Sequence, residues 1–194
     1  DQIILSVKQV ISNCLQDVDV DLLSVFDLEY IILNIRAKSV NNEIDFGFQD
    51  EDTEERVDVK IDVNEVKVYF DPDHSKKIDI DSQYYMMMRY PSLEEVRQMQ
   101  SVNDEESTNT EQMFNTMLSC IDTLVDQETD EVYKLSEFTS EEVADFVDGF
   151  NSTIVESIQK FYITMPKLRH VIEYKDKKGK AKTFVVEGMD SFFT

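Results

Sequence analysis

Three aspartates at alternate positions, Asp17, Asp19 and Asp21, have the spacing with which a calcium-binding loop begins. Such a loop needs a glycine at its sixth position, where the chain turns, and a bidentate glutamate at its twelfth. This sequence has Leu22 and Leu28 there. We therefore interpret the three aspartates as a solvated acidic loop and predict no metal site.

The other residue types that do chemistry are too few or too scattered to form a recognisable site. Zinc needs about four Cys or His ligands at short spacing, whereas this chain has two of each far apart, Cys14, Cys120, His74 and His170. We expect both cysteines to be free thiols. No Gly-x-Ser-x-Gly elbow occurs, and four glycines in total do not make a phosphate-binding loop. The sequence predicts no catalytic residue, cofactor or enzyme activity, although a hydrolase with a pair of carboxylates stays open as an alternative.

The overall charge restricts the class of partner. The chain has 41 acidic and 19 basic residues, a formal charge of −22, in a composition typical of a soluble globular protein. Such a charge repels nucleic acid and anionic lipid at long range. Neither a signal peptide nor a membrane-spanning apolar run is recognisable. We predict a cytoplasmic protein, or part of an assembly made in a cytoplasm. Because Asp1 falls within an apparent helix, we also expect a natural segment to precede it.

The first half of the chain is expected to combine helices with strands. Apolar residues at helical spacing predict a helix over 3–15, and a Ser24/Asp27 cap predicts a second helix through residues 28–38. We interpret 43–56 as an acidic, turn-rich loop. Alternating apolar and charged residues then predict antiparallel strands covered on one face. These strands are expected at 57–63, 66–70, 78–80 and 84–90.

The second half is expected to be mainly helical. A capping box, Ser92 with Glu95, opens a short helix, and residues 101–109 read as a polar linker. Three helical apolar stripes follow, within 113–121, 143–150 and 154–162. The predicted fold class is α+β, with a small antiparallel sheet in the first half and a β-hairpin ending the second. The predicted domains are 1–100 and 110–194, unless the chain forms one compact domain.

The C-terminal hairpin is the candidate partner-binding site. Its strands, 168–175 and 182–187, lie in a segment that holds eight of the 19 basic residues, and we expect its five lysines from 175 to 182 to be exposed. This basic segment could fold back on the acidic body or meet an acidic patch on another protein. The two terminal phenylalanines could fill a groove of their own domain or of a partner. The candidate partner-binding residues are Lys167, Arg169, Lys175, Lys177, Lys178, Phe192 and Phe193.

Three segments also resemble a known family. They are FDLEYIILNIRAKSV (26–40), MRYPSLEEV (88–96) and FYITMPKLRHVIEYKDKKGKAKTFVVEGMDSFF (161–193). Together they resemble the baseplate proteins of T-even-type contractile phages, a family of the baseplate hub subunit and a related hub assembly protein. The resemblance implies a non-enzymatic structural subunit or assembly factor of the central hub of a phage tail. It supplies no catalytic residues.

The resemblance also implies partners and a location. The partners would be other tail, baseplate hub or tape-measure proteins, and homo-oligomerisation is left open. The protein would act in the host cytoplasm during assembly, and its retention in the baseplate of the virion is left open. The alternative from the residues alone is an acidic inhibitor that mimics DNA and occupies a nucleic-acid enzyme.

Overall fold

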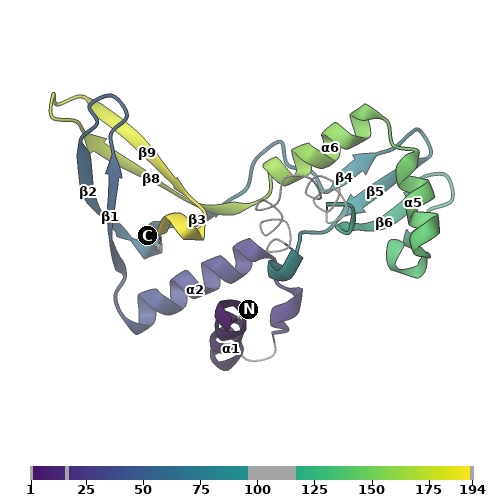
Figure 1. Ribbon diagram of the computed structural model, residues 1–194, viewed down its shortest axis with the longest axis horizontal. Coiled ribbons are helices and arrows are strands. Elements are labelled where there is room, and N and C mark those ends of the chain that lie inside the picture. The colour runs from purple at the N-terminus through teal and green to yellow at the C-terminus, as the bar shows by residue number, and fades with distance from the viewer. Residues whose placement is uncertain (1, 16–17, 96–116, 193–194) are drawn as a thin grey trace. The chain divides into compact units, whose positions relative to one another are not determined.

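The computed structural model describes residues 2–15, 18–95 and 117–192 of the 194-residue chain (Figure 1). The chain forms two compact units. The first contains residues 1–70 and 166–194, and the second contains residues 71–165. The units therefore do not coincide with the predicted ranges 1–100 and 110–194. The predicted linker, 101–109, lies outside the described residues.

The two α-helices of the first unit follow the sequence prediction, and the short 3-10 helix between them was not predicted. They are α1 (Gln2–Cys14), the short 3-10 helix η1 (Val20–Leu22) and α2 (Val25–Ser39). The Ser24 hydroxyl caps α2 by accepting the backbone N–H of Asp27 at 3.4 Å. Arg36 and Lys38 lie in the last turn, where the helix dipole favours cations.

Strands β1 (Glu43–Gln49) and β2 (Arg56–Asp62) form an antiparallel pair. The prediction of a loop throughout 43–56 is therefore wrong for β1. Ile44, Phe46 and Phe48 occupy alternate positions, separated by Asp45 and Gly47, and Ile44 and Phe48 are buried. The glycine and the acidic residues around this period-two pattern are also typical of a turn-rich loop, and the pairing with β2 distinguishes the two. Only residues 50–55 connect the strands.

The predicted C-terminal hairpin is confirmed. Strand β8 (Lys167–Lys175) pairs with β9 (Ala181–Glu187) on one side and with β3 (Lys67–Tyr69) on the other. Two short 3-10 helices, η2 (Val63–Glu65) and η5 (Met189–Phe192), complete the unit. In Figure 1 the β1–β2 pair lies beside β8 and β9. Helix α2 and both sheets enclose one apolar core, formed by Leu33, Ile44, Phe48, Ile61, Val63, Val66, Leu168, Ile172, Val186 and Phe192.

The second unit is a four-stranded antiparallel sheet with helices. The strands, in spatial order, are β4 (Lys77–Asp79), β5 (Tyr84–Met88), β6 (Ile121–Asp126) and β7 (Val132–Lys134). They are followed by η4 (Leu135–Glu137), α5 (Ser140–Asp148) and α6 (Ser152–Ile163). Helix α6 packs on the sheet, with a core of Ile78, Met86, Met88, Cys120, Ile121, Ile154, Ile158 and Phe161.

The predicted mainly helical second half is wrong. Residues 117–118 are helical, but Ile121 already begins β6, and β6 to β9 all lie in this half. Ile121, Leu124 and Val125 have i, i+3, i+4 spacing, which fits a helix as well as a buried strand. Pairing of β6 with β5 and β7 decides in favour of the strand. The rest of the predicted helix, 113–116, lies outside the described residues.

Candidate partner-binding site

The β8–β9 turn is fixed by its own backbone. Gly179 has φ 76°, a left-handed conformation that glycine adopts without strain. The N–H of Gly179 donates to the carbonyl of Asp176 at 2.8 Å, and the Asp176 carboxylate accepts the N–H of Lys180 at 2.8 Å. Local chain chemistry therefore presents the lysines around this turn on an ordered loop.

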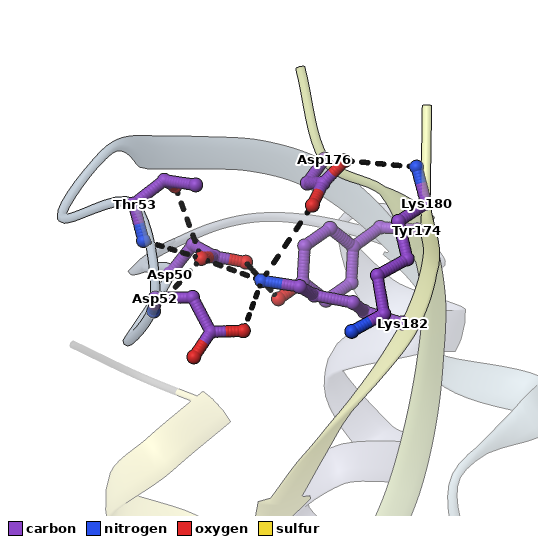
Figure 2. Close-up of polar contacts among 7 residues, drawn as sticks. All are labelled: Asp50, Asp52, Thr53, Tyr174, Asp176, Lys180 and Lys182. Atoms are coloured by element: carbon purple, nitrogen blue, oxygen red, sulfur yellow. Dashed lines mark hydrogen bonds and ion pairs between the residues drawn. The ribbon is translucent and has the colours of Figure 1, made fainter. Parts of the chain in front are cut away.

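Lys182 is enclosed by carboxylates rather than exposed (Figure 2). Its Nζ lies 2.8 Å from both Oδ atoms of Asp50, 2.9 Å from Oδ2 of Asp52 and 3.8 Å from Oδ2 of Asp176. The side chain of Lys182 is 14% exposed and that of Asp50 is 1% exposed. The expectation that all five lysines from 175 to 182 are exposed is therefore wrong for Lys182.

Asp50 is further held by neutral donors. Its Oδ1 accepts the N–H of Asp52 at 3.0 Å and both the N–H and the hydroxyl of Thr53, at 2.9 and 3.0 Å. The Tyr174 hydroxyl donates to Oδ2 at 2.5 Å, and this contact appears beside Lys182 in Figure 2. These bonds tie the β1–β2 turn to both strands of the C-terminal hairpin.

The hydrogen bonds of the cluster keep both Asp50 and Lys182 in their charged forms. The hydrogen bond from Lys182, and then that from Tyr174, hold the pKa of Asp50 well below its usual range. The hydrogen bonds to Asp50 and Asp52 raise the pKa of Lys182 above its usual range. A lysine that stays protonated is neither a nucleophile nor a base. The cluster therefore acts as a structural clamp between the two hairpins.

Two further candidate residues are paired within the first unit. Lys167 Nζ lies 2.5 Å from Oε2 of Glu187, and Arg169 Nε lies 3.6 Å from Oε1 of the same carboxylate. The Arg169 guanidinium also lies over the Tyr69 ring, 4.5 Å from its centroid. The structure thus places both residues at the base of the hairpin, away from its turn.

The remaining lysines, at the turn, differ in whether they form an ion pair. Lys177 Nζ pairs with Oε1 of Glu55 at 2.5 Å, although the lysine side chain stays exposed. Lys175, Lys178 and Lys180 are exposed, and within the described part of the chain no carboxylate lies within ion-pair distance of them. We call these three residues the tip lysines. Sequence reasoning included the first two among its candidates and left out Lys180.

Of the two terminal phenylalanines, Phe192 packs inside its own unit. It is 1% exposed and belongs to the core with Leu33 and Leu168. Its ring is therefore not presented to a partner in this structure. Phe193 lies outside the described residues.

The residues first considered for metal or thiol chemistry have ordinary environments. Asp19 accepts the N–H of Asp21 at 3.1 Å and so caps η1, while Asp17 lies outside the described residues. Among the described residues, no group of three or more His, Cys, Asp and Glu side chains is arranged to hold a metal ion. Cys14 is exposed and Cys120 buried, and both are free thiols. None of the described helices is long and apolar enough to cross a membrane.

Comparison with known proteins gives one match. The family model described as T4 bacteriophage base plate protein matches residues 1–194. No curated protein and no solved structure matches the chain.

Proposed function

Because the chain belongs to the T4 bacteriophage base plate protein family, we propose that it serves as a non-enzymatic structural subunit or assembly factor of the central hub. Membership makes it a phage baseplate protein, which is consistent with a structural role in the tail. The proposal adds the hub as its place and contact with other hub or tape-measure proteins as its action. Assembly would take place in the host cytoplasm.

The observation that carries the proposal is the contrast among the lysines of one hairpin. Lys182 is clamped by three carboxylates of its own unit, whereas the tip lysines are exposed and unpaired among the described residues. In a chain with a formal charge of −22, acidic side chains are plentiful, yet none pairs with them among the described residues. Complementary charge steers association and fixes orientation. An ordered cationic turn suits an acidic patch on a neighbouring protein.

The clamp also supports a structural rather than a catalytic role for this region. Since the pKa of Lys182 is raised and that of Asp50 is lowered, neither group exchanges protons near neutral pH. The cluster instead holds strands β8 and β9 rigidly in place next to their turn. A rigid turn loses less conformational entropy on binding than a flexible one, so more of the charge attraction is retained as affinity.

Co-purification tests the proposal. The chain, carrying an affinity tag, is expressed from the genome of a phage of this family, recovered from infected cells and analysed by quantitative mass spectrometry. We expect hub or tape-measure proteins at a constant ratio to the tagged chain. Recovery of the chain alone, at every stage of infection, would contradict the proposal. Analysis of purified particles by the same method then separates a retained subunit from an assembly factor that leaves.

A further inference from the structure

Helix α5 in the second unit carries an acidic face with no partner among the described residues. Glu141, Asp145 and Asp148 are spaced i, i+4 and i+7, which places them along one side of the helix, and all three are exposed. Val143, Phe146 and Val147 are half-buried and occupy the opposite side. Among the described residues of the second unit, no cation lies within ion-pair distance of the three carboxylates.

This arrangement of charge is unfavourable for the helix itself. Like charges at i, i+3 and i, i+4 repel one another. Asp145 and Asp148 lie toward the C-terminal end, where the helix dipole is negative, and the last turn contains no basic residue. By contrast, Glu142 stabilises the first turn through a capping box with Thr139. A cation placed against the acidic face would relieve the repulsion. Binding of a basic partner at this surface is therefore electrostatically favourable.

The chain contains a surface with the opposite charge and the same lack of partners. The tip lysines Lys175, Lys178 and Lys180 lie on the first unit, are exposed and have no ion pair among the described residues. Three unpaired cations on an ordered turn match three unpaired carboxylates on one helix face. The two surfaces belong to different units of the chain.

We propose that the acidic face of α5 binds the β8–β9 turn of a second copy of this chain. The proposal rests on the proposed docking role of the tip lysines and names the neighbour they meet. The two surfaces differ, so each copy offers both a free turn and a free helix to its neighbour. Two copies can make the contact reciprocally, as a two-fold dimer, or the contact can repeat into a larger ring or an open chain. At physiological salt, screening over about 8 Å limits repulsion between the acidic bodies, while charges in contact still attract.

Exchange of charge between the two surfaces tests the proposal. The tip variant K175E/K178E/K180E has two acidic surfaces, and the helix variant E141K/D145K/D148K has two basic ones. We expect the wild-type chain to associate with rising concentration in sedimentation velocity, and each variant alone to need a roughly tenfold higher concentration. An equimolar mixture of the two variants should recover association, because the acidic turn then meets the basic helix.

Matched variants control for charge and folding. The changes K38E/K67E/K160E and E65K/D73K/E156K exchange the same number of charges at exposed positions elsewhere, and we expect near wild-type association. The neutral variant D145N/D148N should melt at or above the wild-type temperature, since repulsion near the C-terminal end of α5 is removed, and yet associate less. If the acidic face contributed only to folding, its neutralisation would not weaken association while the melting temperature stays the same or rises.

Two results would overturn this inference: a wild-type chain that stays monomeric at all concentrations, or a mixture of the two variants that does not associate. Other results test the proposed function independently of this inference. If the wild-type chain is monomeric but the tip variant no longer co-purifies with other baseplate proteins, the turn docks a different neighbour and only the second copy is excluded. If the tip variant co-purifies normally as well, the docking role of the tip lysines is also wrong.

Discussion

At the scale of single residues, Lys178 and Lys182 show how different the surroundings of two nearby lysines can be. Lys178 is exposed at the β8–β9 turn, whereas Lys182 lies in a shell formed by Asp50, Asp52 and Asp176. Removal of one partner from such an enclosed ion pair leaves the other charge uncompensated, which costs more than the pair contributes. The same substitution should therefore destabilise the fold at Lys182 and have little effect at Lys178.

We expect Lys182→Gln to lower the melting temperature, because Asp50 then stays buried without its cation. Lys178→Gln is the matched control, and we expect no measurable change from it. Thermal unfolding followed by circular dichroism compares the two. The double change D50N/K182Q should be less destabilised than K182Q alone, since no buried charge is left unpaired. Equal melting temperatures for K178Q and K182Q would show that the clamp does not form.

In the second unit, the Arg89–Glu95 pair gives a pH-dependent contribution to stability. Two hydrogen bonds, of 2.6 and 2.9 Å, join the guanidinium to the carboxylate, which also accepts the N–H of Ser92 at 2.8 Å. The bond from Arg89, then those from Ser92, lower the pKa of Glu95 to about 2 from its ordinary 4.5. A lowered pKa stabilises the fold fully above the ordinary value, and this stabilisation is lost as pH falls toward the lowered one.

We therefore expect Glu95→Gln to reduce the free energy of unfolding by about 1–3 kcal/mol at pH 7, where a charged hydrogen-bond acceptor is lost. The difference from wild type should stay constant down to about pH 4.5 and shrink between pH 4.5 and 2. Urea unfolding over this pH series measures it. A difference that does not change with pH would mean that Glu95 is not the titrating group.

At the scale of elements, Phe192 joins the last turn of the chain to the core of the first unit. It is 1% exposed on η5 and packs with residues of α2 and β8. Burial of this ring explains why η5 lies against the unit rather than extending from it. The packing also fixes the base of the C-terminal hairpin that carries the tip lysines.

We expect Phe192→Ala to cost about 3–5 kcal/mol of unfolding free energy, because it leaves a cavity in a filled core. Phe70, which is 63% exposed in the same unit, is the matched control. Phe70→Ala should cost roughly 1 kcal/mol or less. Urea unfolding of both variants measures the two losses. Similar small losses would indicate that η5 detaches from the core in solution.

Much of the fold was predictable where short-range chemistry decides it. The C-terminal hairpin follows from alternation on both sides of a turn with a glycine, and α5 follows from the apolar stripe within 143–150. Strand β6 is not predicted by the sequence: its first residue, Ile121, falls at the end of the helix expected within 113–121, and only pairing with β5 and β7 identifies the strand. Propensity is a weak guide when tertiary pairing decides.

The candidate site was predictable in position but not in its partners. The basic segment and its turn could be read from the sequence, and so could Lys175, Lys177 and Lys178 as candidates. The clamp could not, because Asp50 and Lys182 are 132 residues apart in the chain and any of the 41 acidic residues could have faced the lysine. The outer faces of β1 and β2 are rich in charged residues, and this hid the strand that positions Asp50.

At the scale of the whole molecule, two units carry unpaired charge of opposite sign. The first presents the tip lysines, and the second presents the acidic face of α5, each without an ion-pair partner among the described residues. Since the chain belongs to a baseplate family, contacts with other phage proteins are expected of it. Separation of charge between two surfaces sets a direction for such contacts.

The most direct test is the association of a tip variant with other baseplate proteins in infected cells. The variant K175Q/K178Q/K180Q is compared with K38Q/K67Q/K160Q, which loses the same charge elsewhere, after equal melting temperatures have been verified. We expect recovery of baseplate partners with the tip variant to fall roughly tenfold, as the loss of three exposed charge contacts implies, and to be unchanged with the control. Equal recovery with both variants would contradict docking through the tip lysines.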